Sequence, residues 1–207
     1  MNLKFYEGQR LSFDGALCTV RYIGRVEGTK GDWLGIEWDD PTRGKHSGEH
    51  KGIEYFQCKS KQPAGSFIRP ARPFDKPQGF LEALHQKYGS EFEEELAKQK
   101  DISEKPTPLH DLIQISGKVV EEVGFEKIRK QLAELQELKI VLLDGLRVSG
   151  VISCEESLEK RQEELERIET ACPKIIELDL SRNLLRQWVD IYDICRQLKQ
   201  LSSLKLR

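Results

Sequence analysis

The sequence lacks the features that would place it in several common classes of protein. No stretch approaches the roughly 18 consecutive apolar residues of a membrane-spanning helix. The formal net charge is only −2 although 33% of the residues are charged, so the chain as a whole is not a basic nucleic-acid binder. Residues 1–10 alternate polar and apolar side chains and do not resemble a signal peptide. We therefore expect a soluble intracellular protein.

Cysteine is scarce and scattered, and no C-x-x-C pair occurs. The five cysteines are Cys18, Cys58, Cys154, Cys172 and Cys195. An odd, dispersed set suits free thiols in a reducing compartment. His46, His50 and Cys58 do not have the spacing of a zinc site. Because the sequence also has no nucleophile elbow and no P-loop, we expect neither a catalytic site nor a cofactor nor a bound metal.

The first third of the chain predicts short β-strands separated by glycine-rich turns. Asp14-Gly15 is a strong hairpin signal. This turn lies between two β-rich runs, and three more such runs follow it. The five expected strands cover residues 11–13, 17–23, 34–38, 53–58 and 66–69. Many short strands with glycine-rich turns are typical of a small barrel or sandwich.

The hydrophobic period changes near residue 79. Apolar side chains at Phe80, Leu81, Leu84 and Tyr88 share one helical face, which predicts a helix. A connector through residue 110 follows, because its prolines cannot continue a helix. Beyond it, the pattern predicts a strand at residues 112–115 and a helix at residues 125–138.

The last third of the chain contains the leucine-rich-repeat pattern L-x-x-L-x-L-x-x-N-x-L. The pattern is filled by Ile175, Leu178, Leu180, Asn183 and Leu185. Another copy begins at Leu201, and a less regular one begins at Leu135, with Leu143 at its asparagine position. We expect Asn183 to hydrogen-bond inward to neighbouring loop backbone, as in this fold. The charged insert at residues 155–170 is expected to be a helix with a solvated face and with apolar contacts at Leu158, Leu165 and Ile168.

Four blocks in the first third share one further pattern of glycines, aromatics and a lysine. They are Trp33-Leu34-Gly35-Ile36-Glu37-Trp38, Gly44-Lys45-His46-Ser47-Gly48, Tyr55-Phe56, and Gly65-Ser66-Phe67-Ile68-Arg69. Their order and spacing resemble a CAP-Gly domain. The resemblance implies a small β-barrel-like module that binds acidic peptide tails ending in an aromatic residue.

The Gly44–Gly48 turn is the centre of the expected binding site. Both glycines are expected to allow positive φ, so that backbone amides point at a carboxylate, and Lys45 adds a compact positive charge. The resemblance implies that Trp33 and Phe67 line an apolar slot and that Arg69 lies at its rim. The tail-binding candidates are Trp33, Gly44, Lys45, His46, Ser47, Gly48, Phe67 and Arg69. We expect Lys45→Ala and Gly48→Val to abolish binding while leaving the domain folded, with some instability in Gly48→Val. The alternative is that this segment is only a solvated β-turn.

Two departures from the family pattern affect this site. Most CAP-Gly domains have Asn-Asp where this chain has His46-Ser47. An imidazole can also donate to the terminal carboxylate, so binding should strengthen as pH falls from about 8 to about 6, around the usual histidine pKa of about 6.5. Gly28 stands near the position where many relatives have an aromatic residue, which implies a shallower slot. Trp38 and Tyr55 are expected in the core or in a turn rather than at the ligand.

The predicted fold class is multidomain, β plus α/β, with three parts. They are a CAP-Gly domain at residues 1–72, a helix and linker at 73–110, and the start of a leucine-rich-repeat solenoid at 111–207. Because the last repeat stops partway, we expect the N-terminal portion of a longer protein.

The pairing of a CAP-Gly domain with leucine-rich repeats resembles the tubulin-folding cofactors. It implies a cytoplasmic, cytoskeleton-associated chaperone rather than an enzyme. The implied partners are α-tubulin and its acidic C-terminal tail, the tubulin heterodimer and other tubulin-folding cofactors, with no nucleic acid and no membrane. The alternative is a microtubule-tip linker or cargo adaptor. Such proteins often carry basic, Ser/Pro-rich flanks or long heptads, and the sequence shows neither.

Overall fold

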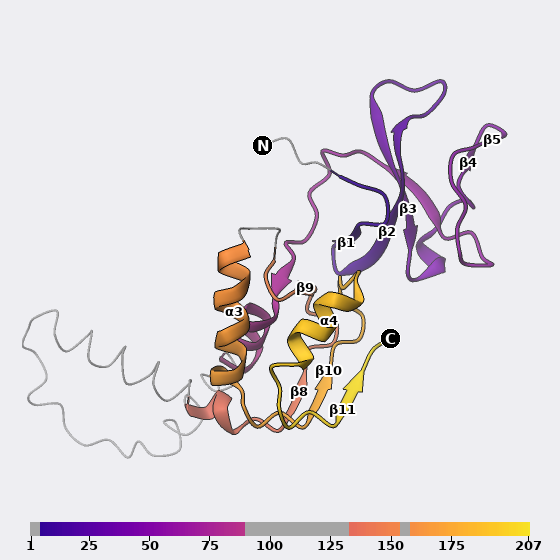
Figure 1. Cartoon of the computed structure of the whole chain (residues 1–207). Helices are drawn as coiled ribbons and strands as arrows, with labels where there is room; N and C mark the ends of the chain where they lie inside the picture. Colours follow the sequence, from indigo (N-terminus) through magenta and orange to yellow (C-terminus); the bar gives the residue numbers. More distant parts are fainter. Residues whose placement is uncertain (1–4, 90–132, 154–157) are drawn as a thin grey trace, which may run out of the picture.

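The computed structural model describes residues 5–89, 133–153 and 158–207. Figure 1 shows two units, a β-rich first unit that contains strands β1 to β6 and a second unit that contains the later strands and the helices. Within these ranges, none of the helices combines the length and the apolar character needed to cross a bilayer.

The first unit is built on an antiparallel sheet with the strand order β1-β2-β3-β6. These strands are Arg10–Phe13, Ala16–Arg25, Asp32–Trp38 and Gly65–Ile68. The predicted Asp14-Gly15 hairpin is confirmed, since both residues have positive φ, as a tight turn of this kind requires. The described part of the sheet is open, with β1 and β6 at its edges, so the expected barrel-like closure is not found.

Shorter elements lie between β3 and β6. They are the 3-10 helix η1 at Pro41–Arg43, β4 at Glu49–His50 and β5 at Ile53–Glu54. The strand expected at residues 53–58 is thus only two residues long. It ends early because the amides of Tyr55 and Phe56 turn to the carbonyl of Gly48 instead of continuing a ladder.

The sheet has a buried inner face and a partly exposed outer face, as the alternation of a strand requires. The inner-face core is formed by Leu11, Phe13, Cys18, Val20, Leu34, Ile36, Trp38 and Ile68. The core position expected for Trp38 is therefore confirmed. Gly35 of β3 pairs with Phe67 of β6 on the outer face, which carries the candidate site.

The second unit contains a parallel ladder in the order β11-β10-β8. These strands are Ser203–Lys205, Glu177–Asp179 and Ile140–Leu142. A separate parallel pair joins β7 at Gln78–Gly79 to β9 at Val148–Gly150. The helices are α3 at Leu158–Ala171 and α4 at Trp188–Cys195, and residues 80–89 and 133–137 are also helical.

Asn183 ties neighbouring turns of the second unit together. Its Nδ2 donates to the carbonyls of Leu143 at 2.8 Å and Leu180 at 3.0 Å. Its Oδ1 accepts from the backbone N–H of Val148 at 2.9 Å. The prediction that this side chain hydrogen-bonds inward to loop backbone is confirmed.

The helix at residues 80–89 packs into the core of the second unit. Phe80, Leu81, Leu84 and Tyr88 are all buried in the cluster that also contains Leu178, which confirms the predicted apolar face. Because these side chains complete that core, the unit as folded begins well before residue 110. The boundaries at residues 72 and 110 stay predictions.

Two other sequence expectations can be compared with the structure. The predicted charged helix is α3, in which Leu165 and Ile168 are buried, but Leu158 is 85% exposed and the contact expected of it is wrong. Leu158 is the first residue of α3, one turn or more away from the buried Leu165 and Ile168. The connector after residue 89, the strand at 112–115 and most of the helix at 125–138 lie outside the described residues.

A short segment joins the two units and is hydrogen-bonded at both ends. The Asp75 carboxylate accepts from Ser12 Oγ at 2.5 Å and from Gly15 N at 2.8 Å, which fixes the segment to the first unit. Burial raises the pKa of Asp75, but these hydrogen bonds, a further one from the Asp14 backbone and the Arg147 charge together lower the pKa below its ordinary value. At the other end, Gln78 N donates to Arg147 O at 3.0 Å, and Arg147 Nε donates to Lys76 O at 3.2 Å.

Candidate functional site

The outer face of β3 and β6 is covered in part by the loop that contains β4 and β5. Phe56 anchors this loop and is only 7% exposed. Its ring lies against Gly35, where an added Cβ would come within 2.5 Å of Phe56 Cε1. The missing side chain at Gly35 therefore makes the place in which the loop docks.

Phe67 is the centre of an aromatic cluster on this face. The rings around it, which with Phe67 form the Phe67 cluster, are Tyr22, His46, His50, Tyr55 and Phe56. His46 stacks on Phe67, with ring centroids 4.9 Å apart and an interplanar angle of 29°. The other rings meet Phe67 edge-on, an arrangement that aromatic pairs favour. Phe67 itself is half-buried, so the cluster forms part of the surface.

Sequence analysis missed Tyr22 and did not place Tyr55 in the Phe67 cluster. Strict alternation from the buried Val20 would put Tyr22 in the core. The register between β2 and β3 shifts between these two residues, so Tyr22 pairs with Gly35 and faces outward. Tyr55 is not a core residue; it meets Phe67 edge-on at 5.6 Å. The bulge leaves no sequence signal, whereas the Tyr55-Phe56 pair was itself part of the motif.

The Gly44–Gly48 turn is hydrogen-bonded to Gly65, the first residue of β6. Lys45 N donates to Gly65 O at 2.8 Å, and Gly65 N donates to His46 O at 2.8 Å. The expectation of positive φ is right for Gly48, at 114°, and wrong for Gly44, at −71°. Gly44 is needed for close packing instead, since an added Cβ would lie 2.1 Å from Pro63 O.

The backbone amide of Gly48 is already used inside the turn. It donates to His46 Nδ1 at 3.0 Å, so it is not available for a peptide carboxylate. The side chains of Lys45 and Ser47 are exposed. No carboxylate in the described part of the chain forms an ion pair with Lys45. The charge that the turn offers to a ligand is therefore the Lys45 ammonium rather than a nest of amides.

His46 is held as a neutral ring. Partial burial, and to a smaller extent the nearby charge of His50, lowers the pKa of His46; Lys45 adds to this and Glu49 opposes it. Because Nδ1 accepts the Gly48 N–H, the ring proton belongs on Nε2. Neutral His46 can thus donate to a carboxylate through Nε2, and protonation at Nδ1 would break the turn's own hydrogen bond. The expected gain in binding at low pH loses its physical basis.

The first prediction concerns the stability of this turn as a function of pH. The lowered pKa of His46 means that the unfolded chain takes up a proton before the folded chain does. The contribution of His46 to the free energy of unfolding is therefore fully present above its pKa of about 6.5 in the unfolded chain. This contribution is lost as the pH falls below that value. Urea unfolding at about pH 7.5 and 5.5, one unit either side of that value, should show lower stability at the lower pH.

The control for this prediction is His46→Asn, because asparagine Oδ1 can accept the Gly48 N–H without titrating. The variant should lose part of the pH dependence. Burial also lowers the pKa of His85, so a remainder of the same sign is expected from the second unit. Identical pH profiles in the two proteins would show that His46 does not titrate as described.

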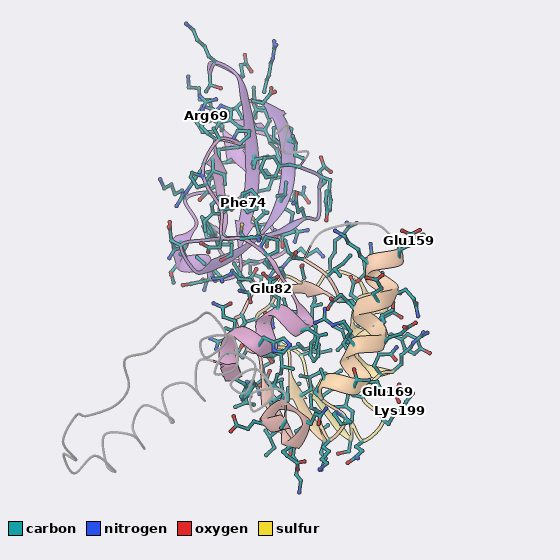
Figure 2. All side chains as sticks on the ribbon, turned by 90° about the vertical axis from the view of Figure 1, so that its left-hand side faces the viewer. Arg69, Phe74, Glu82, Glu159, Glu169 and Lys199 are labelled. Carbon is teal, nitrogen blue, oxygen red and sulfur yellow. The ribbon has the colours of Figure 1, made fainter. Side chains whose placement is uncertain are left out.

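Trp33 and Arg69 hold together the loop between β2 and β3. The Arg69 guanidinium lies 3.5 Å from the centre of the Trp33 ring, and its Nη1 donates to Lys30 O at 2.6 Å. Trp33 Nε1 donates to Thr29 Oγ1 at 2.8 Å. Arg69 thus covers one face of the Trp33 ring. Figure 2 shows Arg69 at the end of the first unit that is farthest from the second unit.

A second cation approaches the site beside Gly28. An added Cβ at Gly28 would lie 3.0 Å from Lys51 Nζ, so the ammonium occupies the space at the position where the family resemblance implies an aromatic. Lys45 and Lys51 are both exposed. The structure therefore combines an aromatic cluster with exposed ammonium groups, which suits an acidic ligand with an apolar end. Among the described residues, no group of three histidine, cysteine, aspartate or glutamate side chains could hold a metal ion.

Comparison with known proteins identifies the first unit. The family model described as "CAP-Gly domain" matches residues 7–73. Residues 7–73 form a CAP-Gly domain. A solved structure titled "Bik1 CAP-Gly domain with ETF peptide from Bim1" matches 30% of this chain and 74% of its own, at 25% identity and a TM-score of 0.28.

The CAP-Gly domain and the second unit together are similar to proteins named tubulin-specific chaperone E. The identity is 38% over 199 residues with the protein of Bos taurus and 40% over 200 residues with that of Xenopus laevis. Each match covers 96% of this chain and 33% of the relative. The protein of Dictyostelium discoideum is 32% identical over 203 residues. The chain thus spans about a third of the length of the curated relatives it matches.

Proposed function

We propose that this chain is part of a tubulin-folding cofactor whose CAP-Gly domain grips the acidic C-terminal tail of α-tubulin. The observation that carries the proposal is the Lys45 ammonium, exposed and without an ion-pair partner among the described residues, beside the half-buried Phe67 cluster. The similarity to tubulin-specific chaperone E supports the choice of partner. The proposal places the protein in the cytoplasm, in contact with the cytoskeleton and with other tubulin-folding cofactors.

The geometry suggests how such a tail is held. A carboxylate of the tail binds the Lys45 ammonium and accepts from His46 Nε2–H, which the turn leaves unused. The aromatic end of the tail lies on the exposed side of the Phe67 cluster, where ring edges are available. Lys51 adds charge for the preceding acidic residues. Of the other candidates, Ser47 is an exposed donor in the turn, Gly44 and Gly48 shape the turn, and Trp33 and Arg69 fix the adjoining loop.

We further propose that the second unit is the start of a leucine-rich-repeat solenoid that contacts the folded body of tubulin. Its ladder has one short strand per repeat, and its outward face carries the exposed Ile140 and Leu142 beside Glu177 and Asp179. Solenoids use such faces to bind proteins. Two contacts with one partner raise the effective concentration at each, so a weak tail contact suffices to help assemble or dissociate the α/β heterodimer.

The test of this function measures binding of the whole chain to intact and to tail-cleaved tubulin. Deleting residues 1–110 is not a usable alternative, because it removes Phe80, Leu81, Leu84 and Tyr88 from the second core. We expect binding to intact tubulin, weaker binding to tail-cleaved tubulin, and no further loss from Lys45→Ala on the cleaved protein. Equal binding to both forms would contradict the tail grip, and co-purification mainly with polymerised microtubules would favour a tip linker.

A further inference from the structure

Helix α4 exposes large apolar side chains on the side that faces solvent. Trp188 is 76%, Val189 49% and Tyr192 63% exposed, whereas Ile194 is buried in the core below. Trp188 and Tyr192 lie four residues apart and share one face of the helix. A surface helix normally directs its apolar stripe inward, so a second, outward stripe calls for a partner.

The acidic and basic side chains of α4 lie on different sides of the helix. Asp193 binds Arg161 of α3 at 2.7 Å, and Asp190 binds the same guanidinium at 3.3 Å. These carboxylates therefore face α3. Arg196 follows Tyr192 by one turn, is exposed, and forms no ion pair with a carboxylate in the part of the chain that the structure describes. The outward stripe thus ends in an unpaired cation.

The stripe continues toward the CAP-Gly domain. The segment that leads into α4 lies against the start of β1, where Arg10 Nη2 donates to Asn183 O at 3.5 Å. The Arg186 guanidinium, two residues before α4, lies 4.8 Å from the centre of the Tyr6 ring, and Tyr6 is 43% exposed. Together these side chains form the surface that we name the α4 surface: Tyr6, Arg186, Trp188, Val189, Tyr192 and Arg196.

We propose that the α4 surface is a second docking site, for an acidic polypeptide segment that carries a large apolar side chain. Tryptophan, tyrosine and arginine are the residue types that most often dominate the binding energy of interfaces. Because the exposed charges of the surface are guanidinium groups, an acidic segment complements them, and a basic one is repelled. The apolar side chain of the ligand packs on Trp188 and Tyr192. This site does not depend on the tail site of the CAP-Gly domain.

The probe is a short peptide of glutamates around one central leucine, with an amidated C-terminus. Amidation removes the terminal carboxylate, so the peptide is a poor ligand for the tail site. Fluorescence anisotropy of the labelled peptide on the whole chain should show saturable binding. Trp188→Ala and Arg196→Ala should each weaken it by roughly thirtyfold or more, the loss expected for a hot-spot side chain. Both residues are exposed, so neither variant should unfold the chain.

Two controls make the result specific. Arg167→Ala, an exposed arginine on α3, and Lys45→Ala in the tail site should leave the affinity unchanged. The matched peptide with glutamine in place of glutamate should bind much more weakly. Absence of saturable binding, or equal binding of the glutamine peptide, would overturn the proposal. Self-association of the chain that Trp188→Ala abolishes would also overturn it, because the occupant would then be a second copy.

Discussion

Replacing Lys45 by alanine should weaken binding of a peptide ending in Glu-Glu-Tyr by about tenfold, without changing the stability of the chain. A charge-assisted hydrogen bond contributes about 1.5–3 kcal/mol, and exposure of Lys45 to water places its effect near the lower end, where about 1.4 kcal/mol is a factor of ten. Isothermal titration with the free-acid peptide measures this change. The wild-type affinity should also fall as salt is added, since the contact is exposed.

The matched control for Lys45 is Lys61→Ala, which removes an exposed lysine from another loop of the CAP-Gly domain. It should bind the peptide like the wild type. If Lys45→Ala also bound like the wild type, the ammonium would not be a ligand contact and the tail site would have to lie elsewhere.

Replacing Gly48 by valine should both destabilise the CAP-Gly domain and abolish peptide binding. Gly48 has φ of 114°, and an added Cβ would lie 1.7 Å from Phe56 O. Left-handed strain and overpacking together cost roughly 3 kcal/mol or more, and relief requires Phe56 to leave Gly35. The sequence predicts some instability for this variant, and the close approach of Phe56 O makes the expected loss of stability larger. Urea unfolding and peptide titration on the same samples measure both effects.

Substitutions at two other glycines separate the two causes of the lost stability, backbone strain and overpacking. Gly52 also has positive φ, at 79°, but no atom lies within 4 Å of an added Cβ, so Gly52→Ala should show only the conformational cost. Gly44 has an ordinary φ and a close neighbour, so Gly44→Ala should show only the packing cost. If Gly48→Val were as stable as Gly52→Ala, the close approach of Phe56 would be wrong.

The sequence predicts most of the framework, because local rules decide it. Alternation and turn chemistry locate the first three strands, and helical spacing locates the buried face at residues 80–88. Asn183 is predictable because its bonds are made to backbone, that of Leu180 three residues earlier and that of Leu143 and Val148 in a neighbouring loop. In the site, the resemblance to the CAP-Gly pattern points to Phe67 and to the Gly44–Gly48 turn, and the structure brings the two together at β6.

The features that escape sequence analysis depend on tertiary contacts. The bulge that turns Tyr22 outward depends on pairing with β3, which alternation along β2 cannot show. Arg69 covers Trp33 because the β2–β3 loop brings backbone carbonyls within its reach. The use of the Gly48 amide by His46 follows from a ring orientation that stacking on Phe67 sets. Each of these changes the role assigned to a residue without changing the fold.

The segment around Asp75 fixes the distance between the CAP-Gly domain and the second unit. Since it is bonded to Ser12 and Gly15 at one end and to Arg147 at the other, the CAP-Gly domain does not swing freely on a tether. In Figure 2, Arg69 marks the end of the CAP-Gly domain remote from the second unit. A partner that binds both units must therefore carry its tail at one fixed distance from the surface that contacts the second unit. Under the proposed function, an acidic tail attached at another distance from the partner's body does not reach the CAP-Gly domain while that body contacts the second unit.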